Sequence, residues 1–218
     1  MSTGKATPSR GKETTPPLRG TPPKEGNVPR LRFPEFREAG EWEEKPLEAV
    51  CKMQAGKFVA ASEISENQED GLFPCFGGNG LRGYTKTYNQ SGRYALIGRQ
   101  GALCGNVNVV DGDFYATEHA LVTTPKAGVN KNWLFYKLCF LNLNQFATGQ
   151  AQPGLSVDVI EKVPCVVPKD EEEQQKIASC LASLDDLITA QSQKFTTLKT
   201  HKKGLMQQLF PLPSEVSA

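Results

Sequence analysis

The distribution of hydrophobic residues divides the chain into three stretches. The first 30 residues are almost free of apolar side chains, short apolar runs fill the middle of the chain, and a repeat of about 3.5 residues follows Asp170. Because a stretch without apolar residues cannot bury enough surface to offset its ordering entropy, we predict a disordered, basic, Pro-rich tail over residues 1–30. We predict a folded domain over 31–168, a coiled-coil helix over 169–211 and a short tail over 212–218.

The middle stretch has the pattern of a mixed α/β domain. Runs rich in β-branched and alternating apolar residues are bounded by Gly, Pro, Asn and Asp. A single helix is expected over residues 132–146, where apolar side chains lie on most faces and a preceding asparagine can cap the first turn. The fold class is therefore α/β or α+β. Strands are expected at residues 93–97, 102–110, 114–124 and 163–167.

The last stretch predicts a long helix that needs a partner along its length. Asp170 can cap its first turn, and at 1.5 Å per residue the helix reaches about 55 to 60 Å. Its seam is apolar except at Gln191 and Lys202, polar positions that select register or partner. A parallel pair would place Lys202 beside its own copy, so we predict an antiparallel homodimer. The seam consists of Ile177, Leu181, Leu184, Ile188, Gln191, Phe195, Leu198, Lys202, Leu205 and Leu209.

Composition excludes several classes of protein. No run approaches the roughly 18 consecutive apolar residues of a membrane span. The first 30 residues lack the apolar central segment of a secretory signal peptide, so a cytoplasmic location is expected. The six cysteines are too widely spaced for a zinc or redox motif and are interpreted as buried free thiols. The two histidines, His119 and His201, are too few for most transition-metal sites, and His119 is interpreted as structural.

A local positive region is the best indication of nucleic-acid binding. The net charge is +1, and because the first 30 residues hold six basic and two acidic residues (+4), the remainder carries −3. Residues 71–110 nevertheless contain four basic residues and no Asp or Glu, interleaved with tyrosines and amides. Basic side chains suit contacts with phosphates, tyrosines suit stacking, and amides suit base edges. The exposed surface of a polar hairpin would have a similar composition. We expect Arg82, Lys86 and Arg99 to face phosphates, Asn79 and Gln100 to read bases, Tyr84 to stack, and Lys57 to add a backbone contact.

A second loop, over residues 147–156, is uncharged and rich in Gln, Gly and Ser. Glutamine is a bidentate partner of adenine in the major groove, so Gln150 and Gln152 are expected to read bases. A neutral loop of this composition is also ordinary connecting sequence.

Signals for catalysis are weak. Residues 78–83 match GxGxxG formally, but no helix pattern follows and no acidic residue appears until Asp111, which argues against a dinucleotide site. Nucleophile-elbow, zinc-protease, P-loop and amino-methyltransferase motifs do not occur in the sequence. The main alternative function is a small metal-dependent nuclease centred on Glu43 and Lys45. The other is a noncatalytic protein that sequesters a partner through its coiled coil.

Eight short segments stand out by their order and spacing. They are residues 31–36 (LRFPEF), 74–80 (PCFGGNG), 96–102 (LIGRQGA), 114–121 (FYATEHAL), 148–156 (TGQAQPGLS), 163–168 (VPCVVP), 173–178 (EQQKIA) and 202–210 (KKGLMQQLF). Together with Trp42 and Leu47, they resemble the DNA-specificity subunit of type I restriction-modification systems. The resemblance covers about residues 31–211.

The resemblance implies a noncatalytic subunit whose domain over 31–168 is a target recognition domain that reads half of a bipartite site in double-stranded DNA. The helix would be a spacer that docks the methyltransferase subunit, which carries S-adenosylmethionine, within a complex that includes a restriction subunit. No cofactor is then expected on this chain. Members of the family usually have two recognition domains and two such helices, whereas this chain has one of each, so it resembles a half subunit that must pair.

Overall fold

The computed structural model describes residues 26–101, 103–149 and 153–210, which form parts of two compact units, Met1–Glu41 and Trp42–Ala218. The described part of the first unit contains a 3-10 helix, η1 (Pro34–Phe36). Beside it, Arg32 Nη1 donates a hydrogen bond of 2.6 Å to the carbonyl oxygen of Gly40. The tails predicted over 1–30 and 212–218 lie mostly or wholly outside the described residues.

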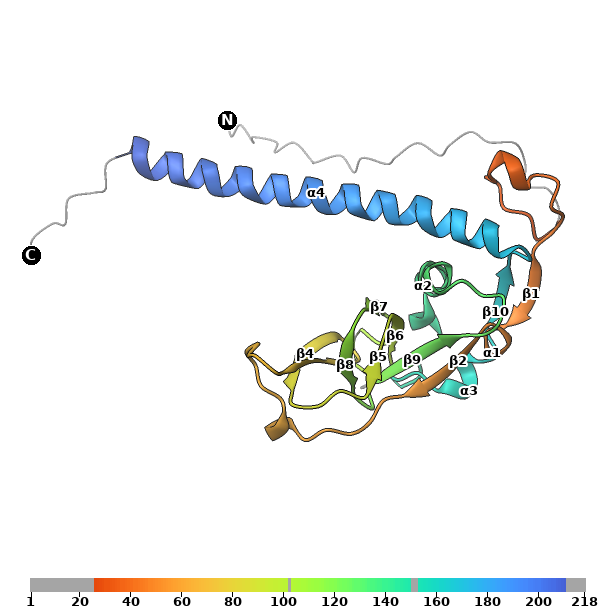
Figure 1. The fold of residues 1–218 in the computed structure, drawn as a ribbon, viewed down its shortest axis with the longest axis horizontal. Helices are drawn as coiled ribbons and strands as arrows, with labels where there is room; N and C mark the ends of the chain where they lie inside the picture. Colours follow the sequence, from red (N-terminus) through yellow and green to blue (C-terminus); the bar gives the residue numbers. More distant parts are fainter. Residues whose placement is uncertain (1–25, 102, 150–152, 211–218) are drawn as a thin grey trace, which may run out of the picture. The chain divides into compact units, whose positions relative to one another are not determined.

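The described part of the second unit contains three small β-sheets (Figure 1). One is an antiparallel pair of β1 (Glu43–Pro46) and β10 (Pro164–Val167). The central sheet is antiparallel and has the order β2 (Cys51–Ala55), β9 (Ala120–Pro125), β6 (Tyr94–Gly98) and β7 (Val107–Val110). The third has the order β4 (Gly80–Thr85), β3 (Phe73–Gly77), β8 (Asp113–Ala116) and β5 (Gln90–Ser91), with β3 and β8 parallel.

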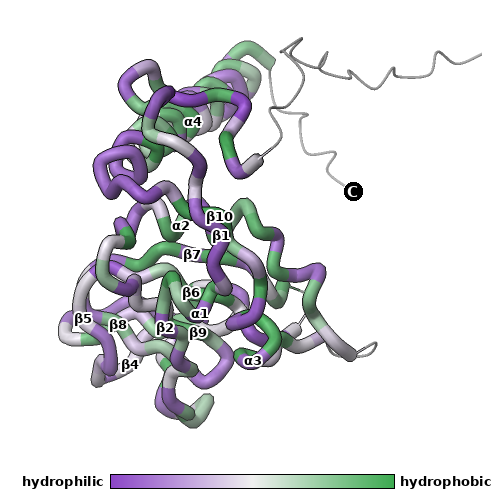
Figure 2. The backbone as a smooth tube through the Cα atoms, turned by 90° about the vertical axis from the view of Figure 1, so that its right-hand side faces the viewer, coloured by the Kyte–Doolittle hydropathy of each residue, from purple (hydrophilic) through white to green (hydrophobic). Residues whose placement is uncertain are grey.

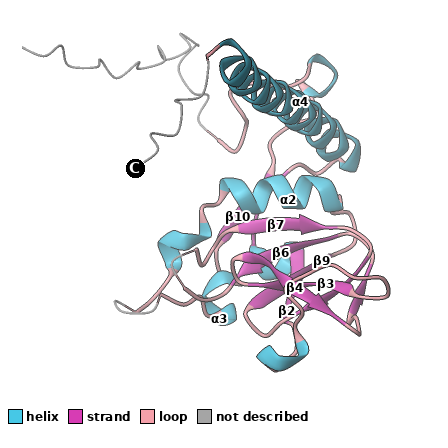
Figure 3. Ribbon diagram, turned by 90° about the vertical axis from the view of Figure 1, so that its left-hand side faces the viewer, coloured by secondary structure: helices cyan, strands magenta, loops and turns pink. Residues whose placement is uncertain are grey.

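The main core lies between the central sheet and helix α2 (Lys131–Phe140), which covers one face of that sheet in Figure 3. Asn130 caps α2, because its side chain accepts hydrogen bonds from the backbone N–H groups of residues 132 and 133. Leu134 and Leu138 are fully buried against Ile97 and the rest of this cluster. The short elements around it are α1 (Leu47–Val50), η2 (Ala61–Glu63), η3 (Leu143–Phe146) and α3 (Val157–Ile160). A second cluster centres on Phe114 and joins the central and third sheets.

The predicted fold class, a mixed α/β domain followed by a long helix, is confirmed, but several element boundaries were wrong. The helix expected to reach residue 146 ends at Phe140, because Asn142 takes a left-handed φ of 47° that no α-helix accommodates. Phe140 is 79% exposed and is not part of the core. The run 114–124 forms two strands separated by a turn, and in the described part of the run 102–110, residues 103–110, only Val107–Val110 is a strand.

The six cysteines are free, as predicted, but the expectation that all are buried was wrong. Cys139 lies on α2 and Cys180 on the C-terminal helix, and both are exposed. Burial raises the pKa of the Cys51 thiol to about 12 and that of Cys165 to about 11. No helix within residues 26–101, 103–149 and 153–210 combines the length and apolarity needed to cross a bilayer.

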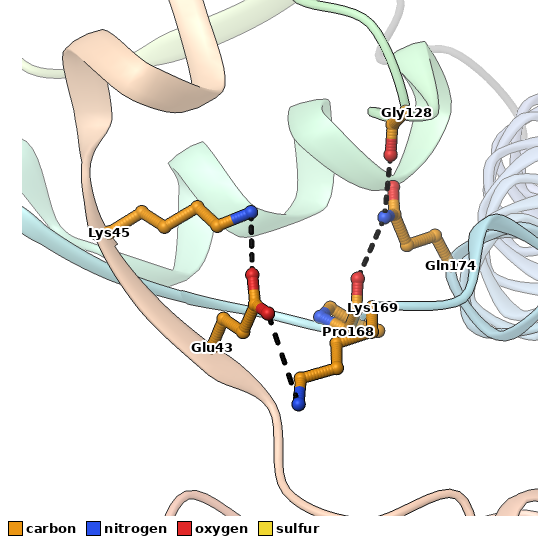
Figure 4. Close-up of polar contacts among 6 residues, drawn as sticks. All are labelled: Glu43, Lys45, Gly128, Pro168, Lys169 and Gln174. Atoms are coloured by element: carbon orange, nitrogen blue, oxygen red, sulfur yellow. Dashed lines mark hydrogen bonds and ion pairs between the residues drawn. The ribbon is translucent and has the colours of Figure 1, made fainter.

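The long C-terminal helix, α4 (Glu171–Leu209), begins where the sequence predicted it. Asp170 Oδ1 accepts a hydrogen bond of 2.8 Å from Glu172 N, which satisfies a free donor of the first turn. Buried Gln174 then fixes the start of the helix, because its Nε2 donates to the carbonyl oxygens of Gly128 and Pro168, each at 3.0 Å (Figure 4). Its Oε1 also accepts from the N–H of Asn130 at 2.8 Å.

Within the described residues, only the first turns of α4 pack on the sheets and helices that precede it. The side chain of Ile177 packs against the main core, and the hydroxyl of Tyr136 on α2 donates a hydrogen bond of 2.7 Å to Asp185 Oδ2. Figure 2 shows hydrophobic and hydrophilic residues alternating along the helix. From residue 184 onward the apolar seam is between 42% and 72% exposed, at Leu184, Ile188, Phe195, Leu198, Leu205 and Leu209. We call these six residues, with Gln191 and Lys202, the free seam.

Candidate nucleic-acid interface

Three segments that are distant in sequence enclose a hollow of about 400 Å³. They are the tip of the β3–β4 hairpin, the loop that follows β6, and the turn that precedes β9. We call this hollow the hairpin pocket. Its lining consists of Gly77, Gly78, Asn79, Gly80, Leu81, Arg82, Gln100, Gly101 and His119.

Glycines let these segments meet backbone to backbone. A Cβ atom on Gly98 would lie 2.0 Å from the carbonyl oxygen of Gly78, a distance that no side chain can occupy. One on Gly78 would lie 3.0 Å from the carbonyl oxygen of His119. That carbonyl also accepts a hydrogen bond of 2.9 Å from Arg99 N, which ties the loop after β6 to the turn before β9. The hairpin tip is therefore held against both of its neighbours.

Arg82 reaches the hairpin pocket because it lies on a β-bulge. Cys75 pairs with Gly83 and Phe76 with Leu81, so Arg82 is the extra residue between two ladder pairs. A bulge re-aims the side chain that it carries, and here the guanidinium lines the hollow. Burial raises the pKa of the Cys75 thiol, and the positive charge of Arg82 acts against this rise.

Three of the predicted DNA-binding residues, Asn79, Arg82 and Gln100, meet in the hairpin pocket, and all three are exposed. Arg99 is half-buried beside it, and its Nε donates a hydrogen bond of 3.4 Å to the carbonyl oxygen of Leu155. Lys57 is exposed and forms an isolated parallel β-bridge with Thr117, the residue that precedes the turn with Glu118 and His119.

The second predicted loop flanks the same pocket. Gln150 and Gln152 lie outside the described residues. Their neighbours are placed: Gly101 N donates to the carbonyl oxygen of Pro153 at 3.0 Å, and Leu155 N donates to that of Arg99 at 2.9 Å. The described end of this loop therefore lies beside Gln100 and Gly101.

Tyr84 and Lys86 line a different hollow, of about 490 Å³, at the C-terminal end of β4. Its wall includes Glu63 and Glu69, whereas the lining of the hairpin pocket contains no Asp or Glu. A carboxylate repels phosphate, so the hairpin pocket is the better candidate for contact with DNA. Tyr115 closes this second hollow, where burial raises its pKa and its hydroxyl donates a hydrogen bond of 3.1 Å to the carbonyl oxygen of Phe58.

One member of the acid-free region does not belong to the interface. Arg93 Nη1 forms an ion pair of 3.1 Å with Asp111 Oδ2, and its Nε donates to Asn132 Oδ1 at 2.9 Å. Asp111 lies one residue beyond the window 71–110, so the charge count over that window does not reveal this ion pair.

Sequence reasoning did not place His119 at the hairpin pocket. It was interpreted as a structural residue of a strand, but it lies in the turn between β8 and β9, lines the hairpin pocket and has a side chain 40% exposed. The only signal that could have found it is the polar pair Glu118–His119 within a run that is otherwise largely apolar.

The residues of the nuclease alternative form ion pairs on β1. Glu43 Oε2 lies 2.7 Å from Lys45 Nζ, and its Oε1 lies 3.8 Å from Lys169 Nζ (Figure 4). The hydrogen bond and charge of Lys45 lower the pKa of Glu43. Among the described residues, no cluster of three His, Cys, Asp or Glu side chains could hold a metal ion. The nuclease alternative therefore gains no support.

Residues 39–200 match the family described as the type I restriction modification DNA specificity domain, and the chain belongs to this family. It is 46% identical over 151 residues to the type I restriction enzyme EcoprrI specificity subunit of Escherichia coli, a match that covers 69% of this chain and 37% of that protein. It is 28% identical over 155 residues to the putative type I restriction enzyme specificity subunit S.HindORF215P of Haemophilus influenzae, covering 67% and 39%. The resemblance predicted from the sequence is confirmed, and the chain spans less than half the length of these relatives.

Solved structures show the same fold. The S subunit of a type I restriction-modification system from M. genitalium superposes with a TM-score of 0.66 at 15% identity, covering 78% of this chain and 46% of that one. A structure that addresses complex assembly and conformational transition of the type I system gives 0.60 at 19% identity, covering 88% and 46%. The HsdS subunit of Thermoanaerobacter tengcongensis gives 0.53 at 18% identity, covering 75% and 41%.

Proposed function

We propose that this chain is a noncatalytic subunit that recognises DNA sequence in a type I restriction-modification complex and reads one half of a bipartite site. The observation that carries the proposal is the hairpin pocket, where Asn79, Arg82 and Gln100 converge from separate segments in a chain of the DNA specificity family. Methyl transfer and cleavage belong to the partner subunits, and S-adenosylmethionine binds to the methyltransferase subunit. The complex acts on DNA in the cytoplasm.

The side chains of the interface divide into two roles. Arg82, Lys86 and Arg99 contact phosphates, and Lys57 adds a backbone contact, because cations position a protein on DNA without reading its sequence. Base edges are read by amides, which can form paired hydrogen bonds with adenine. The glycines of the hairpin tip favour close approach, because they present backbone in place of side chains. The base-reading set comprises Asn79, Gln100, Gln150 and Gln152, and Tyr84 stacks at the second hollow, beside Lys86.

The free seam of α4 supports pairing with a second copy in antiparallel orientation. The intervals between successive residues of the free seam are the same when counted from either end of the helix. Two antiparallel copies therefore bring every seam residue opposite a seam residue of the other copy. The two polar residues then meet each other, whereas a parallel pair would set Lys202 against Lys202. The facing pairs are Leu184 with Leu209, Ile188 with Leu205, Gln191 with Lys202, and Phe195 with Leu198. A dimer of this kind supplies two recognition domains, and the methyltransferase subunit docks on the same helices.

Replacing Arg82 with alanine is expected to weaken DNA binding about tenfold and to lower the slope of log affinity against log salt by about one, because one phosphate contact is lost. Fluorescence anisotropy with a mixed-sequence duplex, repeated over a salt series, measures both quantities.

Arg93→Ala is the matched control, since it removes the same charge from an arginine that is paired with Asp111 outside the pocket. It should leave the salt slope close to that of the unmodified protein. Equal losses in the two variants would show that the interface has been misplaced. A chain that binds no DNA would instead favour the sequestering alternative.

A further inference from the structure

The turn between β8 and β9 holds His119 rigidly at the wall of the hairpin pocket. Ala120 N donates a hydrogen bond of 3.0 Å to the carbonyl oxygen of Thr117, and His119 N lies 3.4 Å from Thr117 Oγ1. The His119 carbonyl accepts from Arg99 N on the other side. The backbone is thus fixed from two directions while the imidazole remains exposed to the hollow.

A carboxylate lies against the His119 ring. Glu118 Oε1 lies 3.2 Å from His119 Nε2, and Glu118 Oε2 is buried with no hydrogen-bond partner among the described residues. When the ring carries a proton on both nitrogens, a carboxylate at this distance accepts a charge-assisted hydrogen bond from it. The contact also fixes the tautomer: the proton of the neutral ring lies on Nε2, toward Glu118, and Nδ1 carries the lone pair.

One lining cation, Arg82 from β4, opposes a charge on the ring while the pocket is empty of DNA. Arg99 contacts His119 through its backbone N–H, whereas its side-chain Nε donates to the carbonyl oxygen of Leu155. The other lining side chains that approach from these elements, Asn79 and Gln100, are neutral. Burial raises the pKa of Cys75 on β3 and of Tyr115 on β8, so both of these groups are uncharged near neutral pH. An anion that enters the hollow shifts this balance toward a protonated ring.

We propose that His119 contacts DNA in its protonated form, with Glu118 as the residue that positions it. On binding, the neutral ring takes one proton from solvent at Nδ1, and the resulting N–H donates to an acceptor on DNA, either a phosphate oxygen or O6 or N7 of guanine. This inference rests on the proposed function and adds to it a contact residue and its protonation state. Because the bound complex holds the proton more tightly, affinity is highest at low pH and falls as pH rises.

The first test uses the fact that the chain has only two histidines. The ring Cε1–H resonances of His119 and His201 are followed by NMR over a pH series, with and without a mixed-sequence duplex, and His201→Gln assigns them. The His119 resonance is expected to titrate at higher pH when the duplex is present. An unchanged titration of His119 in the DNA complex overturns the inference.

The second test measures DNA affinity from about pH 6 to about pH 8, the range in which histidine changes charge. The unmodified protein should lose about tenfold over this range, as expected when binding is linked to one proton. His119→Gln, which keeps a hydrogen-bonding side chain but cannot gain charge, should show less than about twofold change, and Glu118→Gln an intermediate loss. His201→Gln, on exposed α4, should behave like the unmodified protein. Circular dichroism checks that each variant folds.

The source of the acceptor follows from the DNA used. If the pH-dependent loss of affinity is equal on mixed-sequence duplexes and on duplexes that the protein enriches from a random-sequence pool, His119 binds phosphate. If the loss is confined to the enriched duplexes, His119 binds a base. DNA binding with identical pH profiles in the unmodified protein and His119→Gln overturns the inference alone. Absence of DNA binding at every pH overturns the proposed function and the inference together.

Discussion

Replacing Phe195 with glutamate is expected to convert the proposed antiparallel dimer into a monomer. Phe195 lies near the midpoint of the free seam, is 60% exposed in the single chain and would face Leu198 of a second copy. Burying each phenylalanine contributes about 2 kcal/mol, so the two copies together account for about 4 kcal/mol, or about a thousandfold in the dissociation constant of the dimer. Sedimentation velocity at micromolar concentration measures the change.

Gln193→Glu is the matched control, because this residue is two positions away and projects about 200° around the helix, on the face opposite the seam. It adds the same charge without entering the interface and should leave the dimer intact. A monomeric unmodified protein, or a Phe195→Glu variant that remains dimeric, would contradict the proposed pairing.

Cysteine cross-linking separates the two orientations of the dimer. With exposed Cys139 and Cys180 replaced by serine, a mixture of Gln191→Cys and Lys202→Cys chains should form mixed disulfides. Lys202→Cys chains alone should not form a disulfide. In an antiparallel pair, residue 202 of one copy and residue 202 of the other lie 11 residues apart along the helix axis, about 16 Å, which is well beyond disulfide range. Rapid self-linking of Lys202→Cys would identify a parallel dimer.

Gly98→Ala is expected to damage the hairpin pocket although it changes no side chain that contacts DNA. The new methyl group would lie 2.0 Å from the Gly78 carbonyl oxygen, so the hairpin tip must move and carry Asn79 with it. We expect the free energy of unfolding to fall by about 1 to 3 kcal/mol, as for other overpacked sites. We also expect DNA affinity to fall about tenfold or more, since misplacing paired amide contacts costs about 1 to 3 kcal/mol.

Gly77→Ala provides the comparison within the same hairpin. A Cβ atom at this position would be 3.6 Å from Thr117 Oγ1, an ordinary van der Waals distance, and so should be tolerated. Urea denaturation and anisotropy on both variants measure the difference. Equal behaviour of the two variants would show that the backbone contact between Gly78 and Gly98 does not hold the pocket together.

Features of the fold that depend on local sequence were predicted well. The cap at Asp170 and the uninterrupted heptad pattern identified α4 almost to the residue, because helix initiation and periodicity are local properties. The acid-free region drew attention to Asn79 and Arg82, but no strands were expected around them, and the β3–β4 hairpin that carries these residues was missed.

Features that depend on contacts between distant residues were not predictable. The parallel pairing of β3 with β8 and the bulge at Arg82 arise from sheet assembly, which no short window encodes. The same is true of His119, which becomes part of the pocket only because the turn before β9 meets the hairpin tip. The left-handed residue Asn142 ended a helix whose hydrophobic pattern continued beyond it.

Selection from a pool of random-sequence duplexes most directly tests whether this chain reads DNA sequence. The purified protein is expected to enrich an inverted repeat of two short half-sites separated by a fixed spacer, with one half-site read by each copy of the hairpin pocket. Asn79→Ala and Gln100→Ala should each relax base choice within the half-site while retaining binding. Recovery of bound duplexes with no enriched sequence over successive rounds would contradict the assignment of this chain as a sequence-recognition subunit.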